Sequence, residues 1–193
     1  MRNIKIFTYL SQISLVFSMA ICTITLPQVA ETNGGVSNFG NNPSTVAIYS
    51  LGFSCCALFF WLSANSLISA SHKLKRIAYV FSVIGELYLL VLLSTFPRRY
   101  SFAYSRAHDY LGIALFFIEF IFSLWILLRI QSYSSAINFA ITASGMAIGL
   151  ISILKVADLL FVGQSVASIG FALLVCLNFP QVISPYLNNA GSQ

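Results

Sequence analysis

The chain has 193 residues, of which 58% are hydrophobic and 8% charged, and it carries a formal net charge of +5. Soluble domains contain about 25% charged residues, so this composition excludes a water-soluble globular protein. Nucleic-acid binding is also excluded as the reason for the positive charge. No basic helix with interleaved aromatic residues is present, and the cations lie at the ends of apolar segments, where they set topology and contact lipid headgroups.

Six apolar segments follow one another along the chain. They are Ile6–Leu26, Thr45–Ser69, Ile77–Phe96, Tyr110–Ile130, Ala136–Leu154 and Val162–Ser184. Each has about 20 residues, which is long enough to cross a hydrocarbon layer about 30 Å thick as a helix. The sequence therefore predicts an all-α, polytopic membrane protein in which residues 1–193 form a single bundle of six transmembrane helices.

Arg2 and Lys5 precede the first segment, as basic residues precede the apolar core of a secretory signal peptide. The apolar run of this segment is longer than the roughly 7–15 residues of a signal-peptide core, and a cut after Ala30 would place Gln28 where a small residue is preferred. We therefore expect a retained helix. The connection 27–44 that follows contains Gly34-Gly35 and Asn41-Asn42-Pro43, which predict an irregular loop.

The Lys and Arg residues between the segments predict the orientation. With the N-terminus inside, the inner segments carry Arg2, Lys5, Lys73, Lys75, Arg76 and Arg129, and the outer segments carry Arg98, Arg99, Arg106 and Lys155. The excess on the inner side favours a protein of the cell (inner) membrane with both termini in the cytoplasm, although Arg98 and Arg99 argue against it.

Two acidic residues lie inside apolar segments. Glu86 and Glu119 are near the middle of consecutive, antiparallel segments, at similar depth and without a cation beside them. An ionised carboxylate at the bilayer centre costs about 2.5–3.5 kcal/mol on insertion scales. We expect both to face the interior and at least one to be protonated or to have a hydrogen-bond donor. They form either a proton relay or a structural polar pair, with Ser82 and Ser123 one turn away as partners.

A second polar cluster precedes the fourth segment. Arg98, Arg99, Arg106 and His108 are candidates for an outer anion or lipid-headgroup site, because guanidinium groups bind phosphate through two parallel hydrogen bonds. The loop that contains Ser37 and Gly40 is the other long outer segment, and we expect it to pack beside His108 in a shallow pocket. Asp109 is expected to cap the fourth helix.

Other patterns predict helix packing and no chemistry. Gly145 and Gly149 form a G-x-x-x-G motif, which allows close approach of another helix, either within the bundle or at a dimer seam. The four cysteines lie within apolar segments without zinc-ligand spacing. Hydrolase, phosphate-loop and dinucleotide motifs are absent, so no catalytic residue, metal or cofactor is predicted.

Short motifs in the first four segments resemble those of a known family. They are Gly35-Val36-Ser37-Asn38-Phe39-Gly40, Thr45, Tyr49-Ser50-Leu51-Gly52-Phe53, Ser94-Thr95-Phe96-Pro97 and His108-Asp109. The chain resembles the prokaryotic membrane proteins grouped as domain of unknown function 998, which are distantly similar to the eukaryotic Frag/DRAM-type six-helix proteins. The resemblance implies six helices, an outer functional face at Ser37, Gly40, Pro97 and His108, no established reaction, and an association of the eukaryotic relatives with lipid organisation.

Three functions follow as hypotheses. The first is a non-enzymatic bundle that binds membrane lipids or a membrane-protein partner, including another copy of itself, through its outer face and helix grooves. The second is a small proton-coupled transporter that uses Glu86 and Glu119. The third is a lipid-headgroup enzyme that uses His108 and Asp109. The missing catalytic motifs favour the first.

Overall fold

The structure, a computed structural model, describes residues 2–31, 35–97, 101–154 and 158–188. The α-helices are α1 (Arg2–Thr25), α2 (Gln28–Glu31), α3 (Val46–Ala70), α4 (Lys75–Thr95), α5 (Phe102–Ile130), α6 (Tyr133–Ile153), α7 (Leu160–Leu173) and α8 (Phe179–Asn188). Two short 3₁₀ helices, η1 (Val36–Asn41) and η2 (His72–Leu74), lie in connections, and the π-helical turn η4 (Leu174–Asn178) joins α7 to α8.

Six stretches of the described chain are helical, long and apolar enough to cross a membrane: Arg2–Thr25, Val46–Ala70, His72–Thr95, Phe102–Ile130, Tyr133–Ile153 and Leu160–Leu187. The predicted all-α bundle of six long apolar helices is therefore confirmed. The chain fits an integral, multi-pass membrane protein, because these helices leave large apolar side chains such as Phe17, Leu51 and Phe117 exposed on the outside of the bundle.

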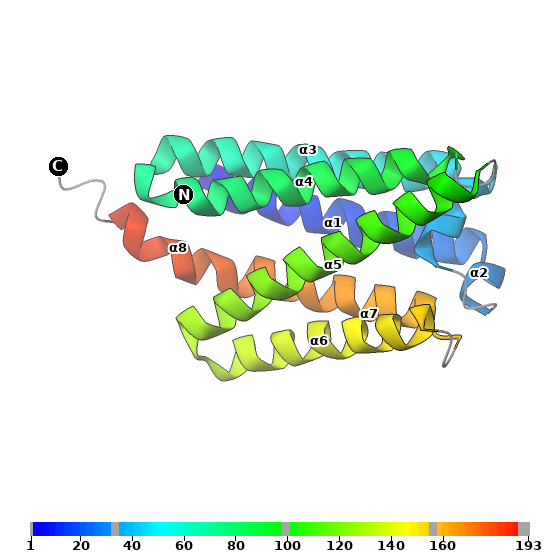
Figure 1. Cartoon of the computed structure of the whole chain (residues 1–193). Coiled ribbons are helices and arrows are strands. Elements are labelled where there is room, and N and C mark those ends of the chain that lie inside the picture. The colour runs from blue at the N-terminus through cyan, green and yellow to red at the C-terminus, as the bar shows by residue number, and fades with distance from the viewer. Residues whose placement is uncertain (1, 32–34, 98–100, 155–157, 189–193) are drawn as a thin grey trace.

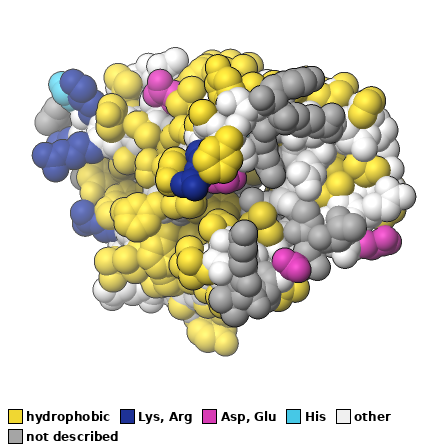
Figure 2. All heavy atoms as spheres, turned by 45° about the vertical axis from the view of Figure 1, so that its right-hand side comes forward, with side chains coloured by type: hydrophobic (Ala, Val, Ile, Leu, Met, Phe, Trp, Pro, Cys, Tyr) yellow, Lys and Arg dark blue, Asp and Glu magenta, His cyan; other side chains and the backbone are white. Residues whose placement is uncertain are grey.

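The helices pack in two groups (Figure 1). Helices α1, α3 and α4 lie side by side, α6 pairs with α7, and α5 runs obliquely from the first group to the second. The start of α1 and the end of α8 lie at the same end of the bundle. We call this the basic end, because Arg2, Lys5, Lys73, Lys75, Arg76 and Arg129 lie there; α2 and η1 lie at the opposite, loop end. Figure 2 shows a group of basic side chains on its left, with further basic atoms near its middle.

Helix α5 begins earlier than predicted. Its first residue is Phe102 and its N-cap residue is Ser101, so the expectation that the helix starts at Tyr110 is wrong. The polar residues between Phe102 and Tyr110 made this segment resemble a loop. A transmembrane helix can, however, extend past the hydrocarbon layer into the headgroup layer, where polar residues are accommodated. Asp109 consequently lies two turns inside the helix, exposed, and it is not the cap that we expected.

Small residues bring α6 and α7 into backbone contact. Gly145 and Gly149 are both buried. A Cβ atom at Gly145 would overlap the backbone of Ala167, and one at Gly163 would overlap the backbone of Gly149. The G-x-x-x-G motif therefore faces a helix of the same chain, which is the packing of small residues that allows membrane helices to approach closely.

The last predicted span, Val162–Ser184, is one apolar stretch but not one regular helix. The π turn η4 precedes Pro180, which lies in α8. A proline ring collides with the carbonyl four residues before it in an α-helix, here that of Cys176. Widening the turn around Cys176 relieves this collision, and π turns are a common way for a helix to accommodate such an interruption.

Candidate functional site

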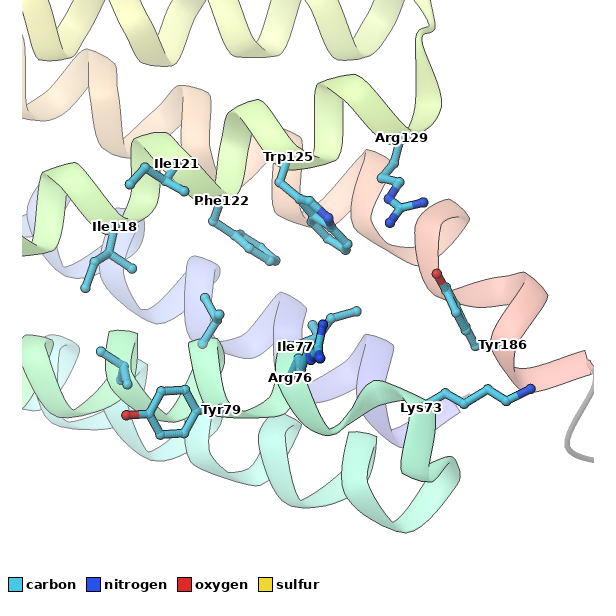
Figure 3. A pocket seen from close by; sticks show the side chains of 12 residues that line it. Lys73, Arg76, Ile77, Tyr79, Ile118, Ile121, Phe122, Trp125, Arg129 and Tyr186 are labelled. Atoms are coloured by element: carbon cyan, nitrogen blue, oxygen red, sulfur yellow. The ribbon is translucent and has the colours of Figure 1, made fainter.

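A lateral groove lies between α4 and α5 at the basic end, where α5 diverges from α4 (Figures 1 and 3). Its volume is about 590 Å³, and Tyr186 of α8 closes one side. The lining residues are Lys73, Arg76, Ile77, Tyr79, Val80, Val83, Ile118, Ile121, Phe122, Trp125, Arg129 and Tyr186. A groove of this size accommodates a ligand as large as a lipid fragment.

Lysine and arginine side chains line the part of the groove nearest the basic end of the bundle. Lys73 and Arg76 come from the turn that starts α4, and Arg129 comes from the last turn of α5; all three are exposed. The Arg129 guanidinium lies 5.9 Å from the ring centroid of Trp125. No acidic residue is among the residues that line the groove, so this end attracts anions.

Apolar side chains make the rest of the groove. Phe122 and Trp125 project from α5 towards α4 (Figure 3), and the isoleucine and valine residues of the lining continue the wall towards the bundle centre. A charged end joined to an apolar channel is complementary to an amphiphile with an anionic headgroup and an acyl chain. The sequence offered a signal for this site, because Lys73 and Arg76 start one span and Arg129, one turn after Trp125, ends the next.

The two intramembrane acids occupy different environments. Glu119 is buried, with 1% of its surface exposed, and the hydroxyl of Tyr88 donates a hydrogen bond of 2.6 Å to its Oε1. Glu86 lies on the exposed face of α4, so the expectation that both acids face the interior is right for Glu119 and wrong for Glu86. The buried and exposed faces of a helix are separated by rotation about its axis. Two residues at equal depth on neighbouring helices can therefore lie on different faces, one buried and the other exposed.

One oxygen of Glu119 has no partner in the part of the chain that the structure describes. Its Oε2 and the Oγ of Ser123 are both buried and have no hydrogen-bond partner among the described residues. The expected bond from Ser123 is therefore not formed. The partner that sequence reasoning missed is Tyr88, which looks in the sequence like any other aromatic residue of an apolar span.

The predicted outer anion site is not assembled from the residues that the structure describes. Arg98 and Arg99 lie outside the described residues. Arg106 is exposed, with its guanidinium 4.8 Å from the ring centroid of Phe102. His108 is 7% exposed, and its Nδ1 lies 3.0 Å from the Oγ of Ser94. Because one side chain points outwards and the other is buried, Arg106 and His108 do not share one site.

The outer loop does approach His108, as expected. Ser37 of η1 is buried, and it lines a small cavity of about 70 Å³ together with His108. Gly40 is buried against Tyr49 and Thr95. The cavity differs from the expected anion pocket, because no Lys or Arg of the described chain is among its lining residues. His108 and Asp109 do not share a face of α5 either, because His108 is buried and Asp109 is exposed.

No protein-family model, curated protein or solved structure matches this chain. The resemblance to the proteins of domain of unknown function 998 therefore stays a prediction.

Proposed function

We propose that this integral membrane protein binds an anionic phospholipid in the groove between α4 and α5. Lys73, Arg76 and Arg129 hold the phosphate by charge-assisted hydrogen bonds, and the apolar wall from Ile77 to Trp125 holds an acyl chain. The observation that carries the proposal is three cations without an acidic neighbour in the lining, placed at one end of an apolar groove that opens on the side of the bundle.

The proposal also assigns an orientation in the membrane, based on the basic residues at this end of the bundle. Among the described residues, the basic end carries six Lys and Arg side chains and no Asp or Glu, whereas Glu31, Asp109 and Asp158 all lie towards the loop end. We place the basic end in the cytoplasm of the cell, since basic residues next to membrane spans are retained on that side. The cytoplasmic leaflet is also the one whose anionic lipids the groove would meet.

The experiment compares lipid retention by native mass spectrometry. The purified protein is mixed with phosphatidylglycerol or phosphatidylcholine in detergent. A triple variant, Lys73→Gln, Arg76→Gln and Arg129→Gln, removes the groove cations. Each basic residue near an anionic surface contributes about 1 kcal/mol, so the three together contribute about 3 kcal/mol, or about a hundredfold in affinity.

The control variant is Arg2→Gln, Lys5→Gln and Lys75→Gln, which removes the same charge from the same end without touching the groove lining. We expect the groove variant to lose phosphatidylglycerol and the control to keep it, with little change for phosphatidylcholine. Equal retention by the two triple variants would contradict the proposal and leave the groove cations as determinants of topology.

The position of Glu86 favours a second candidate function, which is contact with a membrane-protein partner. An ionised carboxylate on the lipid-facing side of a span, near the bilayer centre, costs about 2.5–3.5 kcal/mol on insertion scales. Glu86 is exposed near the middle of α4. A helix of another protein, or of a second copy of this chain, that offers a hydrogen-bond donor to Glu86 would remove this cost.

A further inference from the structure

A small cavity with both apolar and polar lining residues lies between Glu119 and the loop end of the bundle. Its volume is about 70 Å³, and η1 covers it. The polar residues among its lining are Ser37, Tyr49, Tyr88, His108, Gln164 and Ser168. Because a water molecule takes about 30 Å³ in the liquid, the cavity has room for about two waters with several polar partners.

Tyr88 joins this cavity to the buried acid. Its side chain lines the cavity, and its hydroxyl donates to Oε1 of Glu119. The second oxygen of Glu119 has no partner in the described chain, although the side chain is almost fully buried. A carboxyl group that served only to fasten two helices would be expected to have both oxygens bonded, since a buried polar atom without a partner costs about 1–3 kcal/mol.

Among the described residues, few charged or titratable groups act on Glu119. Cys56 faces it from α3 and Tyr88 faces it from α4. No Lys or Arg of the described residues forms an ion pair with it. Glu86 is on the exposed face of α4 and does not share its site. The charge of Glu119 can therefore change only by gaining or losing a proton.

Aromatic side chains close the other side of Glu119. Phe81, Phe122 and Phe179 are buried and lie one to two turns nearer the basic end. Their ring centroids are 5.5 Å apart for Phe81 and Phe122 and 4.9 Å apart for Phe81 and Phe179. In the described part of the chain, these rings pack between Glu119 and the groove, and Ser123, one turn from Glu119 on this side, has no hydrogen-bond partner that would continue a polar route.

We infer that Glu119 is a site of reversible protonation that is reached from the loop end through the small cavity and Tyr88. A water in the cavity gives a proton to the Tyr88 oxygen as Tyr88 passes its own hydroxyl hydrogen to Oε1 of Glu119. The carboxylate becomes a carboxylic acid, the water becomes hydroxide, and bulk water reached through the cavity replaces its proton. Release follows the same steps backwards. His108, on the loop side of Tyr88, exchanges protons with the cavity waters. This inference does not depend on lipid binding in the groove.

The experiment follows the infrared C=O band of a protonated carboxyl in the reconstituted full-length protein after a change from H₂O to D₂O. The band is assigned by its loss in Glu119→Gln and its persistence in Glu86→Gln. We expect Tyr88→Phe to slow the isotope shift of this band by about tenfold or more, the effect of a barrier raised by about 1.4 kcal/mol. Tyr49→Phe is the matched control, because Tyr49 also lines the cavity but bonds to Thr95.

A second variant tests the route without touching the Tyr88–Glu119 bond. Gly112 lines the cavity, and a Cβ atom there would meet no atom within 4 Å, so Gly112→Leu fills space instead of forcing helices apart. It should slow the exchange as Tyr88→Phe does. Exchange at the wild-type rate in both Tyr88→Phe and Gly112→Leu, or a protonated band that survives Glu119→Gln, would overturn the inference.

Discussion

The two glycines of the α6 motif should respond differently to the same substitution. A Cβ atom at Gly145 would overlap backbone atoms of Ala167, and backbone cannot move aside as a flexible side chain can. At Gly149 the nearest atoms would be Phe116 Cε2 at 3.8 Å and Gly163 C at 4.0 Å, which is ordinary contact. Gly145→Ala must therefore push α7 away, and Gly149→Ala need not.

The size of the difference follows from overpacking. An extra methyl group in a packed interior costs about 1–3 kcal/mol. Replacing Gly by Ala in a helix gains up to about 1 kcal/mol of helix propensity, and this gain is common to both variants. We expect Gly145→Ala to be less stable than Gly149→Ala by about 1–3 kcal/mol, with Gly149→Ala equal to the wild type or more stable.

Unfolding of the purified protein by a denaturing detergent, followed by circular dichroism, measures this difference. Size-exclusion chromatography of the same samples reports the oligomeric state. Equal destabilisation by the two substitutions would refute the packing geometry described for α6 and α7. A change in oligomeric state with Gly149→Ala alone would assign the motif to a contact between copies of the chain.

Two further predictions concern the membrane. In intact cells, a membrane-impermeant thiol reagent should label Ser44→Cys, exposed at the loop end, and should label Lys75→Cys only after permeabilisation; the opposite pattern would reverse the proposed orientation. A photo-crosslinking residue at Leu90, one turn from Glu86 on the exposed face of α4, should form a protein adduct that is lost with Glu86→Leu. The same residue at Leu128 of α5 should form none, and adducts at neither position would leave this face of α4 in contact with lipid.

The sequence was sufficient for the number of spans, and most of their ends agree with the structure to within four residues. Length and hydropathy determine this result, because a helix is the structure in which an apolar segment of about 20 residues satisfies its backbone hydrogen bonds within itself inside a bilayer. The early start of α5 at Phe102 was missed, since hydropathy reports the hydrocarbon layer and not where a helix stops in the headgroup layer.

The candidate sites were harder to predict because they depend on rotation about the helix axis. Apolar residues surround Glu86 and Glu119 on every side of their helices, so no amphipathic pattern distinguishes the exposed acid from the buried one. Lys73, Arg76 and Arg129 were interpreted only as topology determinants. Their place around one groove depends on how far α5 diverges from α4, which is a property of packing that no local pattern encodes.

The π turn between α7 and α8 contains one residue more than a regular α-helical turn, and this extra residue accommodates Pro180. At about 100° per residue in a regular α-helix, the buried Phe179 would fall on the side of the span opposite Gly163. The wider turn from Leu174 to Asn178 uses one extra residue and brings Phe179 back towards the core. Deleting one residue from this turn would convert it to a plain α-helix and would keep the residues on both sides of it facing the core. In that helix the ring of Pro180 would again collide with the carbonyl four residues before it, so Pro180 would have to be replaced as well. The insertion and the proline are therefore expected to be gained or lost together.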